Sequence, residues 1–213
     1  MLDQAAREFT GLLRAIELAK LCNRTPCAEY DVRALLNHLR YRGPWLEAAL
    51  RREPAPAVSG GGLDADLTRG DWLGVMCRLV DGLVDACRPP GALAGTTKFG
   101  GSEMPARMVA EMVLTEWVVH GWDQARATGH SLAVDPGTAA ASFASAEGMA
   151  EQAREMKVFG PGVPCPPDAP ALDRLLALTG RDPGWRLREL ACGESHRRRV
   201  RGQPSHSGSS GSR

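Results

Sequence analysis

The sequence predicts an all-α protein, an up-down four-helix bundle with additional C-terminal helices and a disordered tail. Apolar residues recur at the spacing i, i+3, i+4, i+7 in several long segments, and no segment alternates apolar and polar residues over the length of a strand. Hydrophobic residues make up 43% and charged residues 24% of the 213, which is ordinary for a globular domain. We place the helical domain at residues 1–190 and the tail at 191–213.

The first two helices are predicted from their caps and apolar stripes. Asp3 is the expected N-cap of the first helix, which should end near Cys22. Its stripe consists of Phe9, Leu12, Leu13 and Ile16. Asp31 is the expected N-cap of the second helix, in which Gly43-Pro44 should cause a kink or an interruption. Its stripe consists of Val32, Leu35, Leu36, Leu39 and Leu46.

A third helix follows a loop rich in proline and glycine at residues 53–63. It runs through Trp72, Met76, Leu79, Val80, Leu83 and Cys87. Pro89-Pro90-Gly91 should stop it, because proline cannot continue a helix. Residues 91–104 then form a long connection with room for a short hairpin, and connections of this length are often functional.

Three more helices complete the prediction. They are one from about Pro105 to Thr128 with Gly129 as its C-cap, an alanine-rich one from Pro136 to about Lys157, and a short one around Leu172–Leu178 that Gly180 ends. A proline-rich linker at residues 160–170 precedes the last of them. Residues 194–213 are polar, basic and of low complexity, so we expect them to be disordered.

The charge balance and the apolar runs exclude several classes of protein. The formal net charge is only +1, so the domain has no general electrostatic footprint for nucleic acid, and the basic run at residues 197–201 is interpreted as a solvated tail. No apolar stretch is long enough to span a bilayer. The first residues lack a basic region followed by an apolar one, so we expect no secretion signal and a cytoplasmic protein.

Common sequence signatures of chemistry are missing from the chain. The six cysteines include no C-x-x-C pair, and we interpret them as buried thiols that act as small hydrophobic side chains. The sequence also contains no G-x-S-x-G, Walker A, Rossmann or H-E-x-x-H motif. The chemistry therefore has to be sought in residues that the helices bring together.

The fourth predicted helix carries the strongest candidate site. On a helical wheel, Glu116 lies at the centre of the apolar stripe, and His120 lies one turn further along on the same side. A carboxylate on a core-facing stripe must be paired, protonated or bound to a metal. A third ligand has to come from another helix, and His38 lies on the flank of the second helix's stripe. Trp117 lies about 100° from Glu116, so we expect it to pack in the core or at an interface.

Two imidazoles and one carboxylate are a ligand set for a divalent metal. Zinc is the first choice, with nickel, iron and cobalt as alternatives, and such a site keeps a position open for water or substrate. Asp123 follows His120 by three residues, so it could orient that imidazole from outside the ligand set. The same spacing allows Asp123 to form a salt bridge with Arg126 instead.

Three segments of the chain together resemble one known family. Thr25–Leu39, the pair Gly101–Pro105 and Leu114–Gly129, and Phe159–Trp185 resemble the metal-binding domain of mycothiol-dependent maleylpyruvate isomerases and the wider DinB/YfiT superfamily. The resemblance covers about residues 5–186. It implies a DinB-like four-helix bundle that binds one divalent metal through His38, Glu116 and His120, the same three residues that the wheel selects.

Two departures from the family pattern limit what the resemblance implies. Tyr30 stands where the family usually has tryptophan, which should change packing rather than chemistry. The isomerases of this family carry a second, mixed α/β domain, whereas the chain after Gly129 is predicted to form helices and a linker. The resemblance therefore implies the metal site but not the isomerase substrate.

Three interpretations of the site remain open at this stage. The first is an enzyme, an isomerase or transferase in which the metal binds a low-molecular-weight thiol such as mycothiol and delivers it to an electrophile. The second is a non-catalytic module in which the metal fixes the bundle or a pocket senses a small molecule. The third has no metal, with Glu116 and His120 as a buried ion pair. A homodimer is compatible with the sequence, although no apolar stripe demands one.

Overall fold

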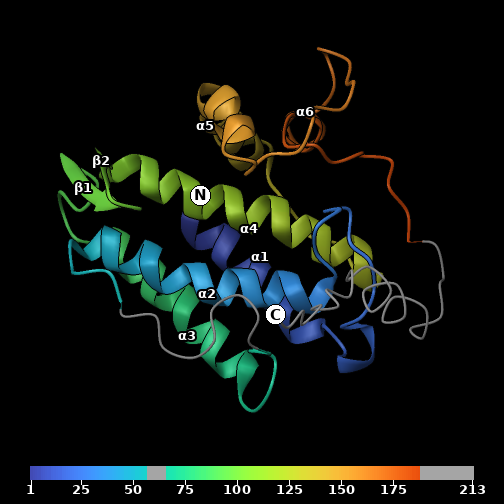
Figure 1. Ribbon diagram of the computed structural model, residues 1–213, viewed down its shortest axis with the longest axis horizontal. Helices are drawn as coiled ribbons and strands as arrows, with labels where there is room; N and C mark the ends of the chain where they lie inside the picture. The colour runs from blue at the N-terminus through green and yellow to red at the C-terminus, as the bar shows by residue number, and fades with distance from the viewer. Residues whose placement is uncertain (57–65, 188–213) are drawn as a thin grey trace, which may run out of the picture.

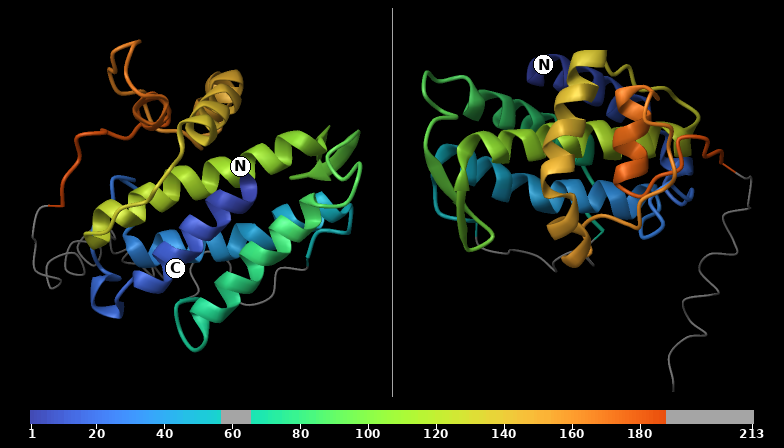
Figure 2. Two further views of the ribbon diagram at one scale, coloured as in Figure 1. Left: turned by 180° about the vertical axis from the view of Figure 1, so that it is seen from behind. Right: turned by 90° about the horizontal axis from the view of Figure 1, so that it is seen from above.

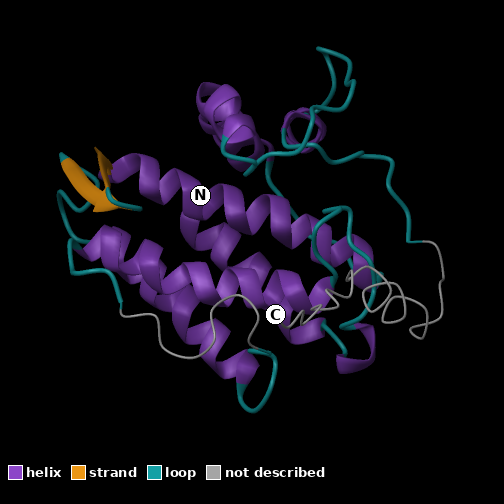
Figure 3. Ribbon diagram, viewed as in Figure 1, coloured by secondary structure: helices purple, strands orange, loops and turns teal. Residues whose placement is uncertain are grey.

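The computed structural model describes residues 1–56 and 66–187, which form a mainly helical structure (Figure 1). Four helices make the bundle: α1 (Leu2–Ala15), α2 (Val32–Arg51), α3 (Trp72–Cys87) and α4 (Ala106–Thr128). Two more lie on the outside of α4: α5 (Pro136–Glu155) and α6 (Ala171–Leu178). The smaller elements are the 3-10 turn η1 (Leu18–Lys20) and a hairpin of β1 (Thr96–Phe99) and β2 (Ser102–Pro105) (Figure 3). The prediction of an all-α bundle is confirmed.

Two apolar cores lie on opposite sides of α4. In the main core, α1 and α2 each contact both α3 and α4. Its most buried side chains include Phe9, Leu13, Leu36, Leu50, Met76, Val80, Val109 and Val113. The second core joins α4 to α5 and α6 through Val118, Val119, Ala146 and Leu175 (Figure 2). Because both faces of α4 are covered, this helix is buried on nearly all sides.

Within the bundle, α2 and α3 run in the same direction, and α1 and α4 run the opposite way (Figure 1). Contacts at the helix ends agree with this. The start of α2 lies beside the start of α3, where Asn37 Oδ1 accepts a hydrogen bond from the Leu67 amide at 2.9 Å. At the same end of the bundle, Lys20 Nζ donates to the Thr128 carbonyl at 2.9 Å. The up-down order expected from the sequence therefore does not hold for α2 and α3, because the starts of these two helices lie at the same end of the bundle.

The first helix ends earlier than predicted. It stops at Ala15 rather than near Cys22, because the backbone of Ile16 is extended and its side chain turns into the core. Tertiary contacts then hold the segment that follows, since the Asn23 side chain donates to the carbonyl of Ala127 at 2.8 Å. The helix also begins at Leu2 with Met1 at the N-cap, so Asp3 lies in the first turn instead of capping it.

The second helix begins as predicted and is longer than expected. Asp31 Oδ1 accepts from the Ala34 amide at 2.8 Å, which confirms Asp31 as the N-cap. The helix continues through Pro44 without the predicted interruption. Close packing supports this region, since a Cβ placed on Gly43 would lie only 2.3 Å from Leu79 Cδ2 of α3. The missing side chain of Gly43 therefore lets α2 and α3 approach closely.

The remaining elements agree with the sequence. α3 ends before Pro89-Pro90, and Gly129 closes α4 with a φ of 77°. The connection before α4 contains the short hairpin, whose turn places Gly100 and Gly101 at φ values of 60° and 83°. Part of the predicted loop at 53–63 and the predicted tail at 191–213 lie outside the described residues. No helix in the described part of the chain is long and apolar enough to cross a membrane.

The segment that leads into α3 generates a test of stability against pH. Arg33 Nη1 lies 2.7 Å from Asp66 Oδ2, and the hydroxyl of Thr68 donates to Asp66 Oδ1 at 2.6 Å. The hydroxyl and amide of Thr68 and the guanidinium of Arg69 outweigh partial burial and lower the pKa of Asp66 to about 2. Because the folded pKa lies below the unfolded value, the ionised carboxylate stabilises the fold above about pH 4, and this contribution is lost as the pH falls toward 2.

We therefore expect Asp66→Asn to lower the free energy of unfolding by about 1 kcal/mol at pH 6, a value reduced by solvent screening. The difference from wild type should shrink as urea unfolding is repeated at pH 4 and pH 3. Asp168→Asn, at an exposed position, is the control and should follow wild type at every pH. An Asp66→Asn difference that stays constant with pH would contradict the assignment.

Candidate metal centre

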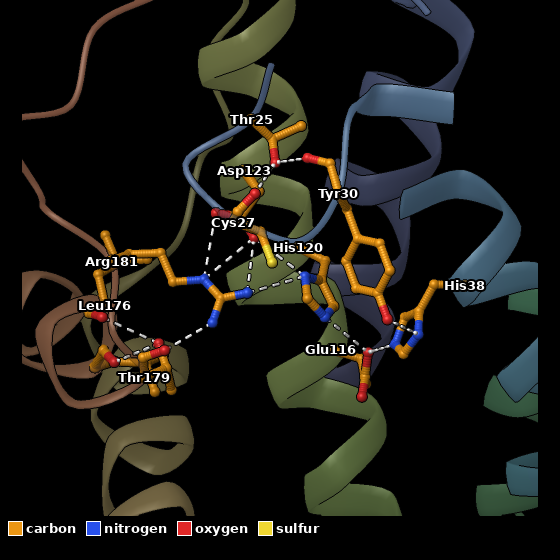
Figure 4. Close-up of polar contacts among 11 residues, drawn as sticks. Thr25, Cys27, Tyr30, His38, Glu116, His120, Asp123, Leu176, Thr179 and Arg181 are labelled. Atoms are coloured by element: carbon orange, nitrogen blue, oxygen red, sulfur yellow. Dashed lines mark hydrogen bonds and ion pairs between the residues drawn. The ribbon is translucent and has the colours of Figure 1, made fainter. Parts of the chain in front are cut away.

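A tight loop at residues 24–31 places one wall of the site. Arg24 and Asp31 pair across its base, and the buried hydroxyl of Thr25 donates to the Tyr30 carbonyl at 2.6 Å. The loop thereby sets the Tyr30 ring beside the imidazole of His38, with the ring centroids 5.2 Å apart. Tyr30 Oη lies 3.4 Å from His38 Nδ1, so the phenol contacts the ring nitrogen that faces away from α4 (Figure 4).

His38, Glu116 and His120 come together where α2 packs against α4. Each offers one donor atom, and the three atoms lie within 4.8 Å of one another. Glu116 Oε2 is 3.4 Å from Nε2 of His38 and 3.4 Å from Nε2 of His120. The two imidazoles meet edge to face, with centroids 5.2 Å apart and an interplanar angle of 72°. Figure 4 shows both rings directed toward the carboxylate. The structure thus gathers the three residues that the sequence selects as ligands.

The carboxylate of Glu116 lacks the partner that a buried oxygen needs. Oε2 is buried and has no hydrogen-bond partner among the described residues, and its two neighbouring nitrogens are too distant for strong ionic hydrogen bonds. Burial raises the pKa of Glu116, but the contact with His38 and the positive charge of either imidazole when protonated lower it more, to about 2. An anionic oxygen facing two ring nitrogens across an open centre is a geometry that suits a cation.

In both imidazoles Nδ1, which points away from Glu116, already has a partner. Nε2 therefore remains for metal ligation. His120 Nδ1 lies 3.1 Å from Asp123 Oδ2, and His38 Nδ1 lies 3.4 Å from the Tyr30 hydroxyl. Histidines that bind metals commonly engage the second ring nitrogen in this way, which orients the ring. Of the two alternatives for Asp123, the contact with His120 is the one observed. Arg126 instead donates to the Trp185 carbonyl at 2.6 Å.

Arg181 is a residue of this site that the sequence analysis did not single out. It follows α6, its side chain is almost fully buried, and its Nη2 lies 3.1 Å from Oδ2 of the buried Asp123. Nη1 donates to the Thr179 carbonyl at 2.7 Å. Arg181 falls inside the third segment of the family resemblance, which was the available signal. Its partner is 58 residues away in sequence, so spacing alone could not identify the pair.

The helical wheel placed Val109 and Val113 in the core, as observed, but was wrong to put Glu116 at the centre of the core-facing stripe. Trp117 is 4% exposed and stacks on Phe9 of α1, with ring centroids 6.1 Å apart. The expectation that Trp117 packs in the core is therefore confirmed. Glu116 lies at the edge of the main core, and its side chain is 22% exposed. α5 and α6 cover the outer face of α4, so apolar residues surround this helix. A single apolar stripe therefore does not identify its core-facing side.

A narrow apolar cleft opens beside Glu116, with room for little more than one or two water molecules. It runs into the main core, and its polar lining residues are Glu116 and Arg42. Its apolar lining includes Leu39, Leu46, Met76, Val80, Val113 and Trp117. The guanidinium of Arg42 lies over the Phe99 ring, 5.3 Å from its centroid. Its positive charge also helps to lower the pKa of Glu116.

The cysteines are more accessible than the sequence suggested. Those in the described part of the chain are free thiols of intermediate exposure rather than fully buried ones: Cys22, Cys27, Cys77, Cys87 and Cys165. Cys192 lies outside the described residues. Cys27 is beside Arg181 and His120 (Figure 4). Burial raises the pKa of the Cys27 thiol, and the nearby Arg181 opposes this only in part.

These features define a helical bundle whose α2–α4 interface holds a His/Glu/His group with the spacing of a metal site. The mycothiol maleylpyruvate isomerase N-terminal domain family matches residues 2–125, and the chain belongs to this family. Similar relatives include uncharacterized proteins from two strains of Mycobacterium tuberculosis, each 30% identical over 189 residues, or 85% of this chain and 96% of the relative. No solved structure matches the chain significantly.

The pair of Asp123 and Arg181 should be critical for folding stability. We expect Asp123→Ala to lower the free energy of unfolding by about 3 kcal/mol, because it leaves the guanidinium of Arg181 buried without its counter-charge. Asp85→Ala removes a carboxylate 2.6 Å from Arg88 at an exposed site and should change stability little. Urea unfolding of the two variants, compared at one pH, makes the measurement. Similar small losses in both would contradict a buried ion pair.

Proposed function

We propose that this protein binds a divalent metal and uses it in a reaction that depends on a low-molecular-weight thiol, as an isomerase or a transferase. The observation that carries the proposal is the convergence of Nε2 of His38, Nε2 of His120 and Oε2 of Glu116, with Oε2 buried and without a hydrogen bond. Membership of a family named for a mycothiol-dependent isomerase supports the choice of thiol.

The donor set fits zinc or a late first-row transition metal in preference to calcium or magnesium. Two neutral imidazole nitrogens and one carboxylate oxygen suit zinc, nickel, iron or cobalt, and three protein ligands leave a coordination position for a small molecule. When bound, such a cation lowers the pKa of a coordinated thiol and holds it as a thiolate near neutral pH. The protein contributes the orientation of the ligands through Tyr30 and Asp123.

The thiol is proposed to come from outside the chain. Burial raises the pKa of Cys27, so this neighbour of the site is protonated at neutral pH and is a poor nucleophile. The cleft beside Glu116 is too small to hold a substrate, so the substrate would bind at its outer end, near Glu116 and the guanidinium of Arg42. This environment favours an electrophile with an apolar body and a negatively charged group.

Metal content is the first test of the proposal. Protein purified without a histidine tag should contain about one equivalent of a divalent metal by elemental analysis. The double variant His38→Ala/His120→Ala should lose it. The matched control is His130→Ala, which removes an exposed imidazole whose Nε2 lies 3.0 Å from the Ala15 carbonyl. It should keep the metal. Absence of metal from wild type, even after incubation with zinc or nickel, would overturn the site.

Turnover separates an enzyme from a non-catalytic metal module. The loaded protein should convert at least one member of a panel of acidic, unsaturated or halogenated electrophiles only when mycothiol or a related thiol is added. Glu116→Gln should abolish both the metal and the turnover, because it removes the anionic ligand. A fully loaded protein that turns nothing over, but whose melting temperature falls on chelation, would instead favour the non-catalytic module.

A further inference from the structure

The C-terminal helices reach the metal centre through one side chain. We propose that Arg181 is a positioning residue of this centre, which acts through Asp123 to hold His120 with the Nε2 lone pair directed at Glu116. This inference rests on the proposed function for the identity of the site. It adds that the segment after α5, which lies outside the part of the chain that matches the family, completes the site.

The backbone around Arg181 is fixed by the way α6 ends. Gly180 has a φ of 87°, its amide donates to the Ala177 carbonyl at 3.1 Å, and the Arg181 amide donates to the Leu176 carbonyl at 2.8 Å. This pair of hydrogen bonds is a Schellman motif. A Cβ on Gly180 would lie 2.9 Å from Gly160 Cα, so both the conformation and the space require glycine here. Arg181 therefore leaves a rigid turn.

The side chain of Arg181 is held equally firmly. Its Nη1 donates to the Thr179 carbonyl at 2.7 Å, while Nε and Nη2 lie 3.3 and 3.1 Å from Asp123 Oδ2. Arg181 is 6% exposed and Asp123 is 0% exposed. Figure 4 shows the guanidinium of Arg181 beside both the Asp123 carboxylate and His120. The position of Asp123 is thus set from α6 as well as from α4.

The chemistry of these groups determines which nitrogen of His120 carries the proton. A guanidinium can only donate, and Arg181 Nη2 lies 3.5 Å from His120 Nδ1, too far for a good hydrogen bond to a lone pair there. Asp123 Oδ2, at 3.1 Å, is a carboxylate oxygen and accepts. Glu116 Oε2 lies 3.4 Å from Nε2, farther than Asp123 Oδ2 lies from Nδ1, so neutral His120 carries its hydrogen on Nδ1 and keeps the Nε2 lone pair that a metal requires. Tyr30, beside His38, can donate or accept, so it does not impose a tautomer.

A purely structural salt bridge is the alternative interpretation of Arg181. Other contacts already attach this segment to the rest of the fold, since Arg126 donates to the Trp185 carbonyl and Arg154 donates to the Leu178 carbonyl at 3.1 Å. Neither of these arginines contacts the metal-site residues in the described structure. Arg154→Met is therefore a matched control, because it loosens the same segment without touching Asp123 or His120.

The experiment measures the affinity of the full-length, tag-free protein for Co²⁺ by competition with a chromophoric chelator, together with the visible absorption of the bound ion. Arg181→Met should weaken binding by about 10- to 100-fold and change the absorption bands. Arg181→Lys retains the charge but cannot bind the carboxylate with two nitrogens, so its loss should be smaller. Arg154→Met should bind as wild type does. Wild-type affinity and absorption in both Arg181 variants would overturn the inference alone and leave the proposed function standing.

A second measurement needs no metal. It uses two other variants, so it remains informative if Arg181→Met fails to fold. In metal-free protein labelled with ¹⁵N-histidine, NMR should show neutral His120 in the Nδ1–H tautomer. Arg181→Lys should shift the population toward Nε2–H, and so should Gly180→Ala, which keeps the guanidinium but displaces it. An unchanged tautomer in both variants would overturn the inference, whether or not the wild type binds Co²⁺ or turns over a substrate.

Discussion

The arrangement of this protein depends on two carboxylates carried by a helix that is buried on nearly all sides. Glu116 and Asp123 lie two turns apart on α4, and each negative charge needs compensation from another element, because isolated buried charges are strongly unfavourable. The turn after α6 supplies the charge of Arg181 to the second, and α2 supplies the polar imidazole of His38 to the first. His120 lies between them and contacts both carboxylates. The packing of α2 and of α6 on α4 therefore has an electrostatic reason as well as an apolar one.

Most of the fold could be predicted from the sequence, and so could the part of the site that lies within one helix. Helix periodicity and caps placed the helices, and the four-residue spacing of Glu116 and His120 put both on one side of α4. His38 could be selected because few histidines lie inside predicted helices. Arg181 was not selected, because its relation to Asp123 exists only once α6 has packed against α4. The early end of α1 was missed for the same reason, since tertiary contacts of the following segment decide it.

Two parts of the chain contribute residues to the site: the part that matches the family and the C-terminal part that follows it. The matched residues 2–125 contain the three donor atoms of the His/Glu/His group, together with Tyr30 and Asp123. α5 and α6 are helices, as predicted for the chain after Gly129, and the turn after α6 brings Arg181 toward the site. The matched part thus contains the whole His/Glu/His group, whereas the side chain of Arg181 comes from outside it.

The two imidazoles are supported by partners of different stiffness. His120 is backed by a buried ion pair, whereas His38 is backed by a phenol on a short loop at 3.4 Å. The ring of His38 can therefore turn about its side-chain bonds at lower cost than the ring of His120. The loop at residues 24–31 therefore governs how far the His38 ring can turn, even though it provides no donor atom itself.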